Sequence, residues 1–228
     1  MGPELTSLLA ASTALVGSHF ALSHPLRAPM VAKLGENGFL GVYSLINLAF
    51  FVWMIWAFTQ VPAGGVPLWN GTGDIMWAIG SVLTLVAMVM FLGAYIGNPA
   101  MPQPGAEALA RKEPHGAFRV TRHPMMWGFA IWGASHILVM PTPRTVIFAG
   151  AIFLLALLGA RMQDRKKEAL MGEAWVEWES KTSFIPQLGR LFSVGPVLWI
   201  VAVAVWMGLT WLHIWMGSLP AGLWRWIG

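Results

Sequence analysis

The chain contains no cysteine, only two tyrosines and few charged side chains. The absence of cysteine excludes disulfides, thiolate metal sites and cysteine nucleophiles. Charged residues make up 11% of the 228 residues and hydrophobic residues 57%, whereas soluble domains carry roughly 25% charged residues. Lipid is therefore the predicted surrounding of most of the chain.

Six long apolar stretches account for the high hydrophobic content. A helix needs about 20 apolar residues to cross the hydrocarbon core, and the stretches that meet or approach this length are 5–23, 39–59, 75–96, 125–140, 144–162 and 197–215. They lack the alternation of membrane β-barrel strands. Pro141 and Pro143 predict a tight turn between the fourth and fifth stretches. We predict an all-α, polytopic membrane protein of about six transmembrane helices, forming one domain over residues 1–228.

The basic residues are distributed unevenly between the predicted loops. If the six spans alternate in direction, one side of the membrane holds twelve of the fourteen lysines and arginines, and the other side holds only Arg144 and Arg225. The positive-inside rule then places both termini on the outer, periplasmic side of the cell inner membrane. Orientation accounts for the net charge of +4, so membrane lipid is an expected partner and nucleic acid is not.

Two segments on the predicted inner side, 97–122 and 163–189, are too polar to cross a membrane. The second contains Trp175 and Trp178, and their spacing of three suits an interfacial helix at the level of the lipid headgroups. Chemistry is therefore expected near the inner leaflet.

Histidines are the main reactive groups that remain. His19 and His136 fall inside predicted spans, where ionisable residues are costly and often functional. Both follow small residues, Gly-Ser before His19 and Gly-Ala-Ser before His136, which let another helix or a flat cofactor approach closely. Two facing histidines can clamp a haem iron. The alternative is that each histidine only forms a hydrogen bond between helices.

Depth in the membrane argues against a simple pairing of these two side chains. Counted from the inner boundaries of their spans, His19 and His136 differ by roughly 9 Å at 1.5 Å per residue. His24 is a poorer alternative to His19, because Pro25 follows it at the helix end. His213 lies near the outer boundary among tryptophans, where an aromatic belt is expected, and we predict a structural role for it.

The sequence Arg122-His123-Pro124 opens the fourth stretch. One interpretation is a helix start, since proline suits the first helical turn and a cation at the membrane edge can meet lipid phosphate. The other is an anion or cofactor clamp that faces Asp164. The residues alone leave both open.

Several motifs together resemble a known family. They are His19-Phe-Ala-Leu-Ser23, Pro25-Leu-Arg27, Gly97-Asn-Pro99, Arg119-Val-Thr-Arg-His-Pro124 and Trp132-Gly-Ala-Ser-His136. Over nearly the whole chain, they resemble the NnrU family, which is linked to denitrification and nitric-oxide metabolism. That family is in turn similar to plant 15-cis-zeta-carotene isomerase, a haem b protein.

The resemblance implies a cofactor and an activity. It implies haem b with His136 and His19 as axial metal ligands, and a polar wall of Arg122, His123 and Asp164 that meets the haem propionates. The implied chemistry is redox-gated cis–trans isomerisation of a lipophilic, zeta-carotene-like polyene. The sequence departs from the isomerase at Gly133, where the plant enzyme has a cysteine.

Two alternatives stand beside the isomerase. Arg122-His123-Pro124 and Phe184-Ile-Pro186 also resemble the isoprenylcysteine carboxyl methyltransferases, which implies S-adenosylmethionine as cofactor. Where those enzymes have paired glutamates, however, this chain has Gln163 and Asp164 followed by three basic residues, which suit a cationic cofactor poorly. The third reading is a non-enzymatic haem or assembly factor in nitric-oxide metabolism.

Overall fold

The computed structural model describes residues 1–63, 65–217 and 219–227. Over these residues the chain is helical and contains no strand. The elements are α1 (Pro3–Ser23), α2 (Arg27–Gln60), α3 (Asp74–Gly93), α4 (Ala106–Ala110), η1 (Gly116–Arg119), α5 (Pro124–Val139), α6 (Pro143–Met171), α7 (Glu173–Lys181), η2 (Leu188–Val194), α8 (Pro196–Gly217) and α9 (Trp224–Ile227).

Five of these helices, α1, α2, α3, α6 and α8, are long and apolar enough to cross a membrane. The all-α prediction is thus confirmed, and the chain is a multi-pass membrane protein. α5, with 16 residues, is shorter. It nevertheless packs along both α3 and α6 inside the bundle. As Pro141 and Pro143 predicted, a tight turn joins it to α6, which begins at Pro143.

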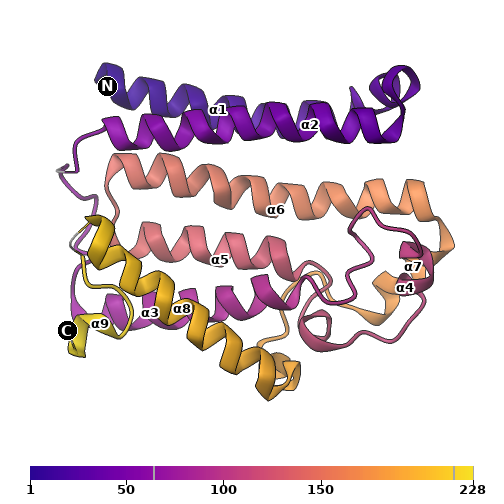
Figure 1. The fold of residues 1–228 in the computed structure, drawn as a ribbon. Coiled ribbons are helices and arrows are strands. Elements are labelled where there is room, and N and C mark those ends of the chain that lie inside the picture. The colour runs from indigo at the N-terminus through magenta and orange to yellow at the C-terminus, as the bar shows by residue number, and fades with distance from the viewer. Residues whose placement is uncertain (64, 218, 228) are drawn as a thin grey trace.

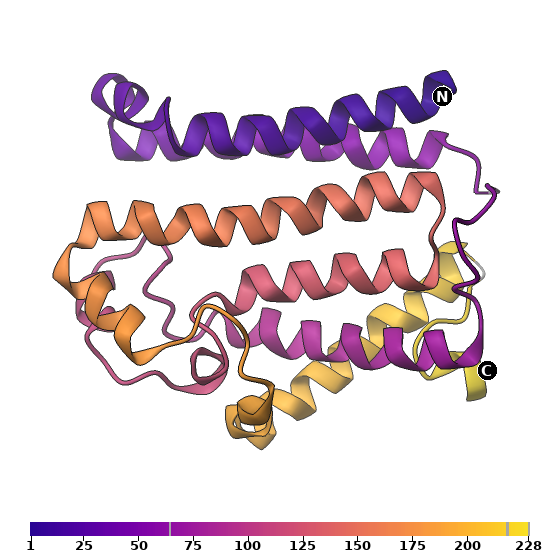
Figure 2. The same ribbon diagram turned by 180° about the vertical axis from the view of Figure 1, so that it is seen from behind.

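The long helices form a curved row in the order α2, α1, α6, α5, α3 and α8 (Figure 1). Along the length of the helices, the N-terminus and α9 lie at the same end of the bundle, as the view from behind also shows (Figure 2). We call this the terminal end. The opposite, loop-rich end is formed by residues 94–122 and 172–195 and by the connection between α1 and α2.

Two helices extend beyond the apolar stretches that predict them. α2 begins at Arg27, and Gly35 kinks it with a φ of 70°, a conformation that glycine adopts without strain. α6 continues through its charged segment to Met171, where Gly172 ends it with a φ of 53°. The polar segment after residue 162 therefore begins as a continuation of α6.

The loop-rich end has its own small core. Trp175 and Trp178 on α7 are 0% and 1% exposed. The Trp178 ring contacts the Phe118 ring edge-on, with 5.6 Å between the ring centres. The prediction that these tryptophans lie at an interface among lipid headgroups is therefore wrong. They are the centre of a packed cluster with Ala110 and Ala174.

Candidate functional site

Arg122, His123 and Asp164 meet at the loop-rich end. Arg122 donates to Asp164 from Nε, 3.1 Å from each carboxylate oxygen, and from Nη2, 2.7 Å from Oδ2. His123 Nε2 lies 2.7 Å from Asp164 Oδ1. His123 comes directly before Pro124, the first residue of α5, whereas Asp164 projects from α6. The cluster therefore ties the start of α5 to α6.

Glu179 from α7 completes this cluster. Its Oε1 lies 3.2 Å from Arg122 Nη2. Burial, together with the neighbouring carboxylates of Asp164 and Glu168, raises the pKa of Glu179 to about 7 despite the attraction of Arg122. The Arg122 guanidinium also lies over the Phe184 ring, 5.4 Å from its centre. Two helices, α6 and α7, and the segment after α7 thus converge on one arginine.

The segment after α7 is held against the start of α5 by hydrogen bonds that its backbone carbonyls accept. Arg122 N donates to Ser183 O at 2.8 Å, and Thr121 Oγ1 donates to Phe184 O at 2.7 Å. Trp127 Nε1 donates to the same Phe184 carbonyl at 2.8 Å. These bonds bury His123 to 2% exposure. The cluster is therefore well built to fix the loop-rich end on the bundle.

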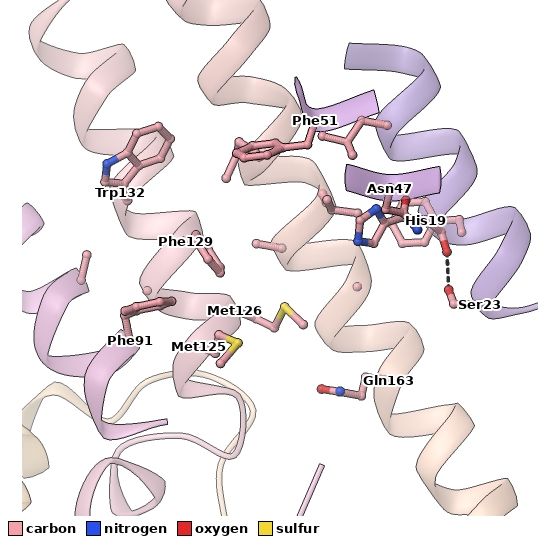
Figure 3. A pocket seen from close by; sticks show the side chains of 18 of the residues that line it. His19, Ser23, Asn47, Phe51, Phe91, Met125, Met126, Phe129, Trp132 and Gln163 are labelled. Atoms are coloured by element: carbon pink, nitrogen blue, oxygen red, sulfur yellow. Dashed lines mark hydrogen bonds between the residues drawn. The ribbon is translucent and has the colours of Figure 1, made fainter. Parts of the chain in front are cut away.

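A separate cavity of about 800 Å³ lies in the concave side of the helical row. Side chains of α1, α2, α3, α5 and α6 line it, and its surface is mainly apolar. Figure 3 shows His19 and Asn47 on one side and Trp132, Phe129 and Met126 on the other. Among the described residues, the lining includes Gln163 and Lys166 but none of Arg122, His123 or Asp164. The predicted polar wall therefore lies near the cavity but not on it.

α2 and α3 are the two ends of the five-helix arc that lines the cavity, and they do not pack closely against each other, which leaves a way into the cavity from the side. Leu48 and Phe51 on α2 line it and are 57% and 36% exposed, and Phe129 on α5 is 39% exposed. In a membrane, exposed apolar side chains at this depth face lipid. A lipophilic molecule can thus enter the cavity from the bilayer without crossing water.

His19 lines the cavity, and its Nδ1 is buried without a hydrogen-bond partner among the described residues. A polar network lies beside it. Ser18 Oγ donates to Asn47 Oδ1 at 3.0 Å, and Asn47 Nδ2 donates to Tyr43 O at 2.8 Å. The Tyr43 ring contacts the His19 ring edge-on at 5.4 Å. This network joins α1 to α2 and positions the imidazole. His24, the other candidate, follows α1 and lines the same cavity.

His136 lies elsewhere, in the last turn of α5 toward the terminal end. Its ring packs on Trp132, with 4.2 Å between ring centres, and faces His213 of α8 at 6.4 Å. Trp132 lines the cavity, but His136 is not part of the lining. The structure thus brings His136 to His213, whereas it places His19 at the cavity.

Sequence reasoning missed several lining residues. Asn47 gave a signal, because an amide inside an apolar stretch needs a buried partner. Met125 and Met126 gave none, since methionine is an ordinary core residue. Among the described residues, no group of three or more histidine, aspartate or glutamate side chains is placed to hold a metal ion.

Comparison with known proteins gives one match. The model of the NnrU protein family matches residues 7–221, nearly the whole chain. No curated protein and no solved structure matches it. The motifs around His19, Arg122 and His136 all fall within the matched range. The chain therefore belongs to the NnrU protein family.

Proposed function

We propose that this NnrU protein is a haem b-binding membrane protein, whose cofactor occupies the cavity with His19 as an axial ligand. The observation that carries the proposal is a cavity of about 800 Å³ bordered by His19, a partly buried histidine whose Nδ1 is buried without a hydrogen-bond partner among the described residues. An imidazole without a partner is costly inside a membrane protein. Iron ligation would offset that cost.

The residues fit the cofactor in three respects. The volume falls within the range of about 300–1,000 Å³ typical of cofactor sites. The lining is mainly apolar, as the porphyrin face requires, and it includes Lys166 and His24, which could supply a cation and a donor to the anionic propionates. The Asn47 amide, held by Ser18 and by the Tyr43 carbonyl, lies beside the His19 ring and can hold its orientation. When bound, haem would supply one-electron redox chemistry and an exchangeable ligand position.

The opposite wall offers Met125 and Met126 as thioether ligands, a type that haem iron accepts together with histidine. The family resemblance implies His136 instead. His136 is eleven residues beyond Met125 along α5, about 16 Å at 1.5 Å per residue, and it is not part of the cavity lining. We therefore assign the first ligand to His19.

We infer six spans, with α5 as the sixth, and both termini on the periplasmic side of the inner membrane. The common position of the N-terminus and α9 at one end supports an even number of spans. The basic residues support the orientation, because Arg119, Arg122 and Lys181 belong to the loop-rich end.

Haem titration of the purified apoprotein tests the proposal. His19→Ala should abolish tight binding, whereas His115→Ala, in an exposed loop, should not. Gly159 and Gly150 on α6 form a second pair, since an added Cβ meets nothing within 4 Å at either position. Only Gly159 lines the cavity. Gly159→Leu should therefore weaken haem binding and Gly150→Leu should not. Equal effects within either pair would refute the assignment of the site.

A second candidate function is cis–trans isomerisation of a carotenoid polyene. The sideways opening between α2 and α3 favours it, because such a substrate is dissolved in lipid. Expression in a host that accumulates 15-cis-zeta-carotene should then convert the cis isomer, as read by chromatography of the pigments. Haem binding without conversion would support the non-enzymatic role in nitric-oxide metabolism.

The methyltransferase alternative has less support from the geometry. Asp164, the carboxylate at the place of the paired glutamates, is already paired with Arg122 and in hydrogen-bond contact with His123. Tight S-adenosylmethionine binding that is lost in Arg122→Ala would reverse this preference.

A further inference from the structure

His136 and His213 form a pair at the terminal end that the haem proposal does not use. His136 lies in the last turn of α5 and His213 near the end of α8. Their ring centres are 6.4 Å apart and their planes are inclined by 35°. α8 packs chiefly against α3, and α5 and α8 are not among the closely packed helix pairs. The proximity of the two rings is thus a specific feature of the fold.

Hydrogen bonds select the same tautomer in both rings. Nδ1 of His136 lies 2.8 Å from the carbonyl oxygen of Trp132, and Nδ1 of His213 lies 2.7 Å from that of Leu209. A carbonyl can only accept, so each Nδ1 carries a proton and donates it. The lone pair of each neutral imidazole is therefore on Nε2, and no described residue bonds to either Nε2. A carbonyl on Nδ1 is the arrangement that metal-binding histidines commonly have.

The spacing suits one shared ion. Metal–nitrogen bonds of about 2.0–2.1 Å, with each ring centre roughly 1 Å behind its nitrogen, separate the centres of two imidazoles across a linear ion by about 6 Å. The observed distance of 6.4 Å between the ring centres is close to this value. Two imidazoles in contact by stacking would lie closer, as Trp132 and His136 do at 4.2 Å.

A methionine follows each histidine. Met216 follows His213 by three residues on α8, a spacing that brings side chains to the same helix face, and Met140 follows His136 by four residues, directly after the end of α5. Met216 is 77% exposed and free to reorient. Imidazole together with thioether favours copper, and soft thioether ligands favour copper(I). We propose that His136 and His213 bind one copper ion at the terminal end of the bundle.

The test uses the full chain purified without haem. Copper(I) is titrated against a coloured competing chelator, with zinc(II) as a parallel probe. Wild type should bind one copper, and His136→Ala and His213→Ala should each weaken binding on the order of 100-fold or more. His115→Ala is the matched control, because His115 is exposed and outside the pair. Tryptophan fluorescence verifies that each variant is folded.

Three results would overturn the copper site. They are wild-type affinity in His213→Ala, preference for zinc over copper, and loss of the haem spectrum in His213→Ala, which would make the pair a haem ligand set instead. The site is independent of His19. A colourless protein that still binds copper would refute the haem proposal alone, and a haem protein that does not bind copper would refute only this one.

Discussion

Removal of the Asp164 carboxylate should destabilise the protein strongly. Asp164 accepts three hydrogen bonds from Arg122 and lies 2.7 Å from His123 Nε2, and its side chain is only 10% exposed. Asp164→Ala leaves a largely buried guanidinium with Glu179 as its remaining partner. Breaking a buried pair in this way costs about 3–5 kcal/mol. At about 2–4 °C per kcal/mol for a chain of this size, Tm should fall by roughly 10 °C.

Thermal unfolding in detergent, followed by tryptophan fluorescence, measures this effect. The matched control is Glu177→Ala, because Glu177 also contacts two cations, Arg111 at 3.0 Å and Lys181 at 2.8 Å, but in an exposed position. Exposed ion pairs contribute little, so this variant should unfold near the wild-type temperature. Asp164→Asn keeps an acceptor and should recover part of the loss. If Tm falls equally in Asp164→Ala and Glu177→Ala, the buried cluster does not hold the loop-rich end on the bundle.

Two further predictions follow from helix packing and from Glu179. A Cβ at Gly133 would lie 2.7 Å from the carbonyl oxygen of Ala149, so Gly133→Ala should cost about 1–3 kcal/mol, whereas Gly150→Ala should be neutral or stabilise by up to about 1 kcal/mol. The denaturation midpoints of Gly133→Ala and Gly150→Ala measure this difference, and equal midpoints would contradict the close packing of α5 on α6. Glu179 holds its proton more tightly when folded, so its contribution to stability declines as pH rises from about 4.5 to about 7. Glu179→Gln should make Tm less dependent on pH between about 4.5 and about 7. An unchanged dependence of Tm on pH would show that Glu179 does not titrate in this range.

Hydropathy predicted the membrane helices well because it reports contact with lipid. The same property explains why α6 was predicted to end near residue 162. The charged residues from Asp164 to Glu168 lie outside the apolar stretch, but none of them ends the helix, which continues to Met171. Trp175 and Trp178 show the converse limit. Their spacing matches both an interfacial helix and a packed one, and only contact with Phe118 distinguishes the two.

The candidate site was predictable where it depends on position along a helix. The difference in depth between His19 and His136 follows from helical rise alone. The approach of Arg122, His123 and Asp164 was one of two open interpretations, and the structure brings these side chains together. The partner of His136 was not predictable, because the contact with His213 depends on how α8 crosses α3 and α5. No local pattern in the sequence encodes that crossing.

The optical spectrum of the protein purified from haem-replete cells tests the central claim most directly. Wild type should show a Soret band with one haem b per chain, and His19→Ala should lose the band while remaining folded by tryptophan fluorescence. A colourless wild type, or a Soret band unchanged in His19→Ala, would contradict a haem held in the cavity by His19.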